Sequence, residues 1–311
     1  MTAKKRIGLA LGSGAARGWG HIGVIRALVR SGIRPDIVCG SSMGALIGAA
    51  YAAGTMDGLA GWAGRLSNRQ VLRLMDFSLT SGGLIEGGRL MEELDGFVAD
   101  TSIESLPMAY AAVAADLDSG EEVWLQDGSL SQAVRASMAL PGLFAPVRRQ
   151  ERWLMDGGLV NPVPVSLCRE LGADVVIGVN LNCGVAGRRA RFAGRETRLS
   201  LSLPENEFFQ RISEGMAPLR ERMLEWFPDD GDEGGKARSP SLFEVMAGSI
   251  DIMQDRITRQ RLRDDSPELL IEPHLGHMGL MEFDRANEAM EEGEAAVEEA
   301  LKGTDLKEIT G

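Results

Sequence analysis

The chain has 311 residues, of which 44% are hydrophobic and 25% are charged, and its formal net charge at pH 7 is -12. This composition is that of an ordinary folded protein with a sizeable core, and it excludes collagen-like and intrinsically disordered chains. The negative charge disfavours nucleic-acid binding, which needs clustered Lys and Arg, and it disfavours simple electrostatic adsorption to anionic lipid.

The number of cysteines and the length of the hydrophobic segments indicate the cellular compartment. Cys39, Cys168 and Cys183 are an odd number without a CxxC pair, so they support neither a disulfide framework nor a zinc site, and no metal or cofactor is expected. The basic residues 4–6 before Ile7–Leu11 superficially resemble a signal peptide, but the apolar run is short. No segment approaches the ~20 apolar residues that span a bilayer. We expect a cytoplasmic protein, with peripheral contact at the inner membrane face left open.

The N-terminal part follows a strand–loop–helix order twice. Ile7–Leu11 is predicted as a buried strand, and 18–29 as a helix after a glycine loop, because apolar residues recur there at helical spacing. Residues 35–40 supply a second strand, and Met43–Ala53 a helix of small residues that can pack closely on a sheet. This order predicts a parallel α/β sheet covered by helices.

The rest of the chain is predicted to complete one α/β domain over 1–311. Residues 59–100 are expected to form a helical cap over the sheet edge. Further strands are expected at 108–117, 122–125, 153–155, 174–180 and 269–271, and further helices at 130–139, 165–171, 242–262 and 283–301. Between them, 184–240 is expected to be a variable insertion, with an amphipathic helix at 205–227 between charged surface segments.

Ser42 lies in Gly40-Ser41-Ser42-Met43-Gly44, between the second predicted strand and the helix after it. Small flanking residues let the strand turn sharply, so that the hydroxyl projects at the carboxyl edge of the sheet while the helix N-terminus faces developing negative charge. A bare GxSxG string also occurs in structural turns. The strand before it and the helix after it favour a nucleophile.

The glycine loop before Ser42 is a candidate oxyanion hole. Adjacent parallel strands bring their C-terminal loops together, so the backbone N–H groups of Gly12, Ser13, Gly14 and Ala15 are expected to face the serine. Arg17 would add a positive charge beside this loop, or form a surface salt bridge. A dinucleotide-binding loop is the rival interpretation, but Arg17 stands where the third glycine of that fingerprint should fall.

A base for Ser42 can be sought among the three histidines. His21 follows the glycine loop, and a helix-packing or surface role is expected for it. His274 and His277 follow Ser42 and Asp156 in the Ser…Asp…His order of α/β-hydrolases, so a triad stays open. That fold, however, normally builds several strands before its nucleophile.

Asp156 is the alternative base. It precedes Gly157 and Gly158 at a predicted strand-to-turn transition, so its carboxylate either projects at the sheet edge or simply caps the turn. An aspartate with a reference pKa of about 3.9 is a weak base, so burial or hydrogen bonding must bring that pKa nearer neutrality.

At these residues the chain resembles the patatin-like phospholipase family, in its small bacterial single-domain branch, most closely over 5–182. The glycine loop, the Ser42 pentapeptide and Asp156-Gly157-Gly158 correspond to the family's oxyanion loop, nucleophile and catalytic aspartate. The resemblance implies a three-layer α/β fold with a mostly parallel central sheet and helices on both faces. It also implies a Ser–Asp dyad, in which Ser42 attacks an acyl ester and Asp156 is the base, with no catalytic histidine.

The leading hypothesis is a serine hydrolase for carboxylic esters of lipids, of phospholipase A or lysophospholipase type. Apolar residues of the 59–85 cap are candidates for an acyl-chain channel. One alternative is an esterase with a His274 or His277 triad, and another is a non-enzymatic binding or regulatory protein. The expected partner is a lipid or ester substrate rather than nucleic acid, and homo-oligomerisation stays open.

Overall fold

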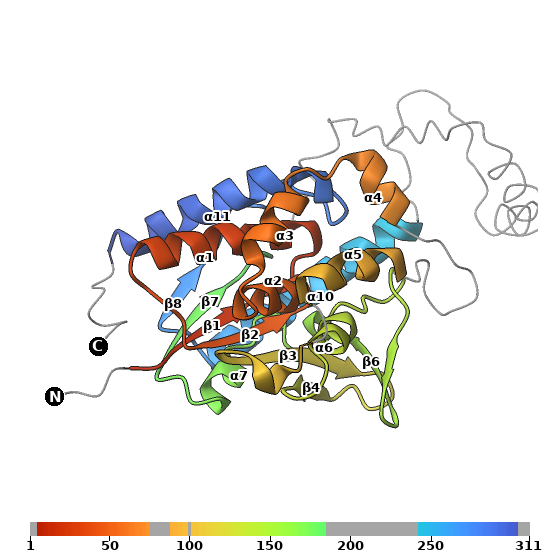
Figure 1. Ribbon diagram of the computed structural model, residues 1–311, viewed down its shortest axis with the longest axis horizontal. Helices are drawn as coiled ribbons and strands as arrows, with labels where there is room; N and C mark the ends of the chain where they lie inside the picture. The colour runs from red at the N-terminus through yellow and green to blue at the C-terminus, as the bar shows by residue number, and fades with distance from the viewer. Residues whose placement is uncertain (1–4, 75–87, 99–100, 185–241, 304–311) are drawn as a thin grey trace, which may run out of the picture. The chain divides into compact units, whose positions relative to one another are not determined.

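The computed structural model describes residues 5–74, 88–98, 101–184 and 242–303, and Figure 1 traces them from red to blue. They all belong to one compact unit. The helix predicted at 205–227 and the charged segments beside it lie outside the described residues. The insertion at 184–240 therefore stays a prediction.

The described residues form one eight-stranded sheet, in which hydrogen-bonded neighbours follow the path β5-β6-β3-β2-β1-β7-β8. β2 and β6 pair with successive parts of one edge of β3, and β4 pairs with its other edge. The strands are β1 (Ile7–Leu11), β2 (Ile37–Ser41), β3 (Ala109–Asp116), β4 (Glu122–Leu125), β5 (Val147–Arg149), β6 (Arg152–Asp156), β7 (Val175–Val179) and β8 (Leu269–Ile271). The strands from β3 to β8 along this order are mutually parallel, whereas β4 and β6 are antiparallel to β3. β1, β2 and β7 are buried along their whole length, as expected of strands covered on both faces.

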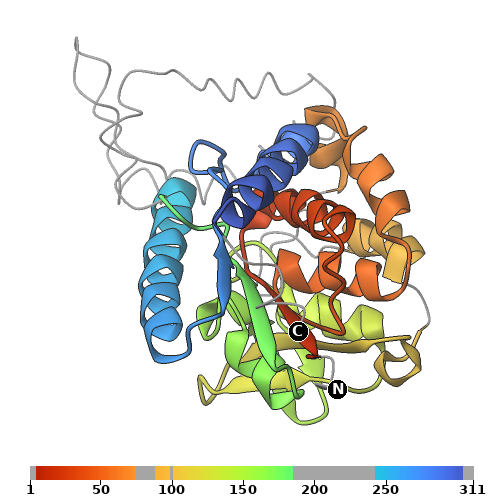
Figure 2. The same ribbon diagram turned by 90° about the vertical axis from the view of Figure 1, so that its left-hand side faces the viewer.

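Helices cover both faces of the sheet, so the mixed α/β fold is confirmed. The α-helices are α1 (Gly20–Arg30), α2 (Met43–Ala52), α3 (Met56–Ala63), α4 (Asn68–Leu74), α5 (Gly88–Val98), α6 (Leu130–Ser137), α7 (Val165–Glu170), α10 (Leu242–Asp264) and α11 (Ala286–Leu301). Short 3-10 helices are η1 (Ala15–Trp19), η2 (Ile103–Ser105), η3 (Gly157–Leu159) and η4 (Phe283–Arg285). Figure 2 shows α10 on one side of the strands and α1 and α11 on the other.

Several predicted boundaries differ from the structure. The helix predicted from Gly18 begins at Gly20 and is preceded by η1, which continues the glycine loop. Strand β5 was not predicted, because its three residues include two arginines and show no apolar alternation. In the described part of the predicted cap, α3 and α5 pack against α2, and α4 packs against η4. Within the described residues, no helix is both long and apolar enough to cross a bilayer.

Candidate active site

Two strands that run toward each other bring Ser42 and Asp156 together. β4 occupies one edge of β3, and β2 and β6 share the other edge: Ser41 lies opposite Val113, and Asp156 lies opposite the next residue, Ala114. β2 runs parallel to β3 and β6 runs antiparallel, so their C-terminal ends meet. Ser42 and Asp156 are therefore neighbours although they stand 114 positions apart in the sequence.

Ser42 is held in a strained turn between β2 and α2. Its backbone has φ 56° and ψ −122°, in a region that a side chain disfavours. Gly44 lets the turn approach β1 closely, because a Cβ there would lie 2.2 Å from the carbonyl oxygen of Leu11. The Ser42 N–H donates to Oγ of Ser137 at 2.9 Å, so α6 also fixes the turn. Gly40 and Met43 flank it, on β2 and at the start of α2.

The carboxylate of Asp156 is completely buried and accepts two hydrogen bonds. Ser42 Oγ donates to Oδ2 at 2.6 Å, and the Gly158 N–H donates to Oδ1 at 2.7 Å. Burial raises the pKa of Asp156 to about 6, although the hydrogen bonds from Ser42 and Gly158 act in the opposite direction. The sequence left the turn-capping role open, and the structure shows the carboxylate bonded both to its own turn, which Gly157 begins, and to the serine.

The glycine loop presents fewer free N–H groups than expected. The N–H of Gly12 donates to the Val179 carbonyl at 3.0 Å, and that of Ser13 donates to the Pro162 carbonyl at 2.8 Å. These two amides anchor the loop and are not available to an oxyanion, so the expectation for Gly12 and Ser13 is wrong. Among the contacts of the described residues, the N–H groups of Gly14 and Ala15 have no acceptor. Ala15 borders the same cavity as Ser42.

Arg17 lies beside the glycine loop, as one expectation had it, but its charge is paired with Asp251, and the pair is largely buried rather than a surface salt bridge. Its side chain is 1% exposed, and its Nη2 donates to Oδ1 of Asp251 on α10 at 2.8 Å. Its Nε and its backbone N–H both donate to the carbonyl of Gly14, at 3.2 and 3.1 Å. In a trans peptide the carbonyl and the following N–H point in opposite directions, so these bonds also orient the N–H of Ala15.

His21 is fully buried and supports the same loop. Its Nε2 lies 2.7 Å from the Gly12 carbonyl oxygen, and burial lowers its pKa to about 4. The ring is therefore neutral at pH 7, and Nε2–H is the donor. Its Nδ1 is buried and has no partner within the described structure. The packing role expected for His21 is thus combined with a hydrogen bond to the loop.

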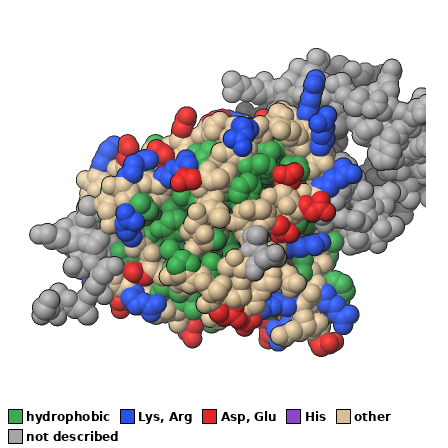
Figure 3. Space-filling model, viewed as in Figure 1, with side chains coloured by type: hydrophobic (Ala, Val, Ile, Leu, Met, Phe, Trp, Pro, Cys, Tyr) green, Lys and Arg blue, Asp and Glu red, His purple; other side chains and the backbone are tan. Residues whose placement is uncertain are grey.

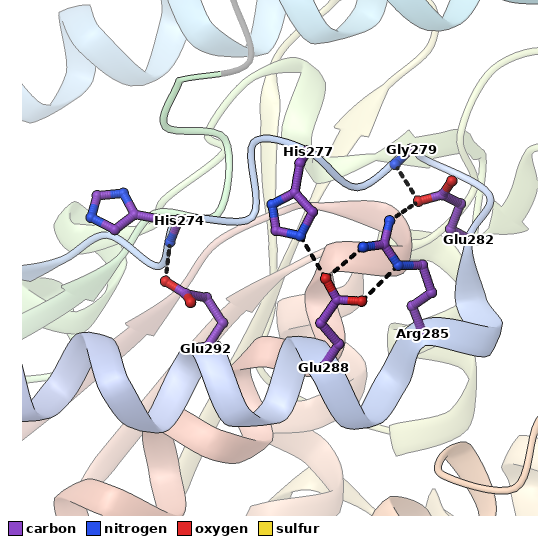
Figure 4. Close-up of polar contacts among 7 residues, drawn as sticks. All are labelled: His274, His277, Gly279, Glu282, Arg285, Glu288 and Glu292. Atoms are coloured by element: carbon purple, nitrogen blue, oxygen red, sulfur yellow. Dashed lines mark hydrogen bonds and ion pairs between the residues drawn. The ribbon is translucent and has the colours of Figure 1, made fainter. Parts of the chain in front are cut away.

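The other two histidines lie beside α11 (Figure 4). His277 Nε2 lies 2.6 Å from Oε1 of Glu288, and the backbone N–H of His274 donates to Glu292 at 2.8 Å. Arg285 also donates to Glu288. Within the described contacts, neither imidazole is bonded to Ser42 or Asp156. The triad hypothesis therefore has no geometric support.

A cavity of about 60 Å³ adjoins Ser42. None of the described residues that border it is charged. Apart from Ser42, the lining residues are Ala15, Trp19, Met43, Leu46, Trp62, Leu66, Val71, Leu74, Leu90, Leu94, Met138, Leu140, Leu143, Phe144, Met281 and Phe283. Part of the predicted cap therefore borders the cavity, although Leu59 is in the core and 75–85 lie outside the described residues. In Figure 3 hydrophobic side chains gather in the middle of one face, and charged ones lie mostly around its rim.

Sequence reasoning assigned no role to three polar residues around the site. Ser137 accepts from Ser42, while Asn182 and Gln254 form a buried cluster with Ser13. Asn182 follows a buried strand, whereas Ser137 and Gln254 lie in helices with many other polar residues, so neither stands out by its type. The described part of the chain holds no group of three His, Cys, Asp or Glu side chains suited to a metal ion.

Comparisons with known proteins show which family this chain resembles. Residues 9–169 match the sequence profile of the family described as patatin-like phospholipase. A Mycobacterium tuberculosis protein described as an uncharacterized NTE family protein is 35% identical over 339 aligned positions, which cover 98% of this chain and 94% of that protein. The mouse patatin-like phospholipase domain-containing protein 7 is 33% identical over 189 positions, covering 58% of this chain and 14% of that protein. The crystal structure of VipD from Legionella pneumophila aligns with a TM-score of 0.48 and 15% identity, over 96% of this chain and 67% of that one.

Proposed function

This chain belongs to the patatin-like phospholipase family, and on that premise we propose that it is a serine hydrolase that cleaves carboxylic ester bonds of lipids through Ser42 and Asp156. Family membership supports lipid hydrolase activity in general. The observation that carries the finer proposal is the 2.6 Å hydrogen bond from Ser42 Oγ to a buried aspartate, beside an apolar cavity.

The proposed reaction begins with proton transfer. Asp156 Oδ2 takes the hydroxyl proton while Ser42 Oγ attacks the ester carbonyl carbon, which forms a tetrahedral intermediate with a negative oxygen. The proton then passes from Asp156 to the leaving alcohol as the C–O bond breaks, and an acyl-enzyme remains. A water molecule attacks this acyl group, gives its proton to Asp156, and Ser42 regains a proton as the carboxylic acid leaves. General-base catalysis of this kind contributes roughly 10²- to 10⁴-fold in rate.

We assign the oxyanion hole to the N–H groups of Gly14 and Ala15. They are the loop amides without an acceptor within the described structure, and Arg17 holds the carbonyl between them. Losing one such donor typically costs about 2.7–4 kcal/mol of transition-state stabilisation. The loop is therefore proposed to matter as much as the base.

The cavity supports an apolar acyl group as the bound part of the substrate. Its aliphatic and aromatic lining gives a hydrocarbon chain a dry surface, and its described lining offers no charged group to a polar head group. The head group would then lie outside the cavity. Because lipid esters reside in bilayers, we further propose transient peripheral contact with a membrane from the cytoplasmic side, which vesicle co-sedimentation tests.

Labelling with a fluorophosphonate, read by intact mass, tests the proposal. Wild-type protein is expected to gain one adduct, Ser42→Ala none, and Asp156→Asn one at a sharply lower rate. Ser249→Ala, at an exposed serine on α10, is the matched control and should label like wild type. Folded wild-type protein that gains no adduct and hydrolyses no ester would contradict the proposal and favour a binding or regulatory role for the fold.

A further inference from the structure

Helix α10 contacts the oxyanion loop at two places, although it comes from a distant part of the sequence. Asp251 pairs with Arg17 at 2.8 Å, and Gln254 accepts a hydrogen bond from Ser13 Oγ at 3.0 Å. Asp251 and Gln254 are three residues apart, so they project from the same side of the helix. α10 lies beyond the residues that match the family profile. These contacts are therefore properties of this chain that the family match does not describe.

Gln254 occupies a buried position between the two catalytic loops. Its side chain is 4% exposed, and its Oε1 accepts from Ser13 Oγ at 3.0 Å and from Asn182 Nδ2 at 3.1 Å. Its Nε2 lies against Gly158, where a Cβ would be only 2.5 Å away. Gly158 is the residue whose N–H donates to Asp156. One side chain thus contacts both the oxyanion loop and the turn that holds the aspartate.

We propose that Gln254 is a positioning residue for the hydrolytic site. It is not among the residues that border the cavity, so it acts through its neighbours. By holding Ser13 it fixes the start of the segment that presents the Gly14 and Ala15 amides. By packing on Gly158, Gln254 also fixes the distance between the oxyanion loop and Asp156. This inference rests on the proposed function of Ser42 and Asp156.

Position 254 requires a polar side chain as long as that of glutamine. Ser13 and Asn182 both donate to its oxygen, and both are buried, so an apolar replacement leaves two buried donors without this acceptor. A displacement of about 1 Å in a catalytic group can reduce the rate roughly 100-fold. We therefore expect loss of Gln254 to reduce turnover more than substrate binding.

Gln254→Met tests the inference, because methionine keeps the volume and removes the polar atoms. Turnover of a soluble p-nitrophenyl ester, counted per active site titrated with fluorophosphonate, should fall about 10- to 100-fold, with KM within about threefold of wild type. Ile252→Ala, at an exposed position two residues away, should leave both constants unchanged. Turnover per active site within about twofold of wild type in Gln254→Met would overturn the proposal.

Gln254→Glu tests independently whether this side chain lies beside the Asp156 turn. It keeps the oxygen acceptor for Ser13 and Asn182 but adds a carboxylate beside the Asp156 turn, near the Arg17–Asp251 pair and Asp255. A second negative charge raises the pKa of Asp156 further, so the acidic limb of the pH–rate profile should move to higher pH. An unmoved limb would contradict the placement of Gln254 beside this turn.

Hydrogen exchange separates failure of this inference from failure of the proposed function. If wild-type protein neither labels nor hydrolyses esters, the proposed function is wrong, but the protection of the loop amides from exchange can still be measured. Gln254→Met should then speed exchange in a peptide spanning 12–19 while leaving one spanning 286–301 as in wild type. If the peptide spanning 12–19 exchanged at the wild-type rate in Gln254→Met, Gln254 would not hold the loop.

Discussion

The site around Ser42 and the cluster around Glu288 contain the same kind of interaction in opposite surroundings. Ser42 Oγ lies 2.6 Å from a carboxylate oxygen of Asp156, and His277 Nε2 lies 2.6 Å from one of Glu288. Burial raises the pKa of Asp156 to about 6, whereas the hydrogen bond from Arg285 is the main cause that lowers the pKa of Glu288. Equal hydrogen-bond lengths thus accompany opposite changes in proton affinity.

The difference follows from solvent and counter-charge. Asp156 is fully buried, and its hydrogen-bond donors among the described residues are neutral groups, so its charged form is poorly stabilised. Glu288 is half exposed and faces a guanidinium, so its charged form is favoured. A carboxylate is the stronger base near neutral pH in the first environment, because its pKa lies closer to that pH. The His277 cluster pairs a histidine with a carboxylate, as a catalytic triad does, but its exposure gives it the properties of a surface interaction.

Replacing the aspartate should produce the largest change. Asp156→Asn is expected to lower kcat by about 10²- to 10⁴-fold, because it removes the proposed base. It should also raise the melting temperature, because a buried charge is replaced by a neutral amide. Steady-state hydrolysis of a soluble ester and a thermal melt measure the two effects. The matched change Glu288→Gln should alter neither markedly, and equal losses in both variants would remove the contrast between the clusters.

Ser137 should come next, because it accepts the N–H of the strained Ser42 backbone. Ser137→Ala leaves that buried N–H without its acceptor, at a cost of about 1–3 kcal/mol in the free energy of unfolding. Turnover should fall roughly tenfold as the serine loses its fixed position. Chemical denaturation and ester hydrolysis provide the two values. If Ser137→Ala had the turnover and the stability of wild type, the turn would hold Ser42 without help from α6.

The pH profile should show the raised pKa of Asp156 directly. Asp156 acts as a base only when ionised, so kcat/KM should rise as the pH increases through about 6 and then level off. For stability the sign is reversed: the folded state holds this proton more tightly than the unfolded chain. The stabilising contribution of protonated Asp156 is therefore lost as the pH rises through about 6. A profile that is flat between pH 5 and 8 would contradict the role of Asp156.

His21 should act on stability with the opposite pH dependence. Its pKa is about 4 in the folded state and about 6.5 in a free side chain, so the unfolded chain takes up the proton first. The folded state therefore loses stability as the pH falls from about 6.5 toward 4. Denaturation at pH 7.5 and pH 5 measures the loss, which His21→Gln should reduce. A loss of the same size in the variant would assign the acid sensitivity to other groups.

The smallest effect is expected from the exposed histidines. The double variant His274→Ala and His277→Ala should keep ester hydrolysis within about twofold of wild type and stability within about 1 kcal/mol, because an exposed ion pair contributes little. The same assays measure both. Abolished turnover in a folded double variant would restore the triad hypothesis.

Local sequence determined most of the elements and the identity of the candidate residues. The runs Ile7–Leu11 and Leu269–Ile271 are strands with the predicted bounds, because buried strands are short apolar runs. Glu122–Leu125 also has the predicted bounds, although it is only partly buried. The Ser42 turn between strand and helix was predicted from its small residues, and the structure shows that turn. Asp156 was singled out from its glycines.

Tertiary structure alone decided how these residues are used. The meeting of β2 and β6 on one edge of β3, which places Asp156 beside Ser42, depends on strand pairing between distant segments. Which loop amides are free depends on acceptors from Pro162 and Val179, and the charge of Arg17 is neutralised by a residue of α10. Burial sets the pKa of Asp156. Burial and long-range hydrogen bonds depend on residues that are far apart in the chain, so no local sequence pattern determines them.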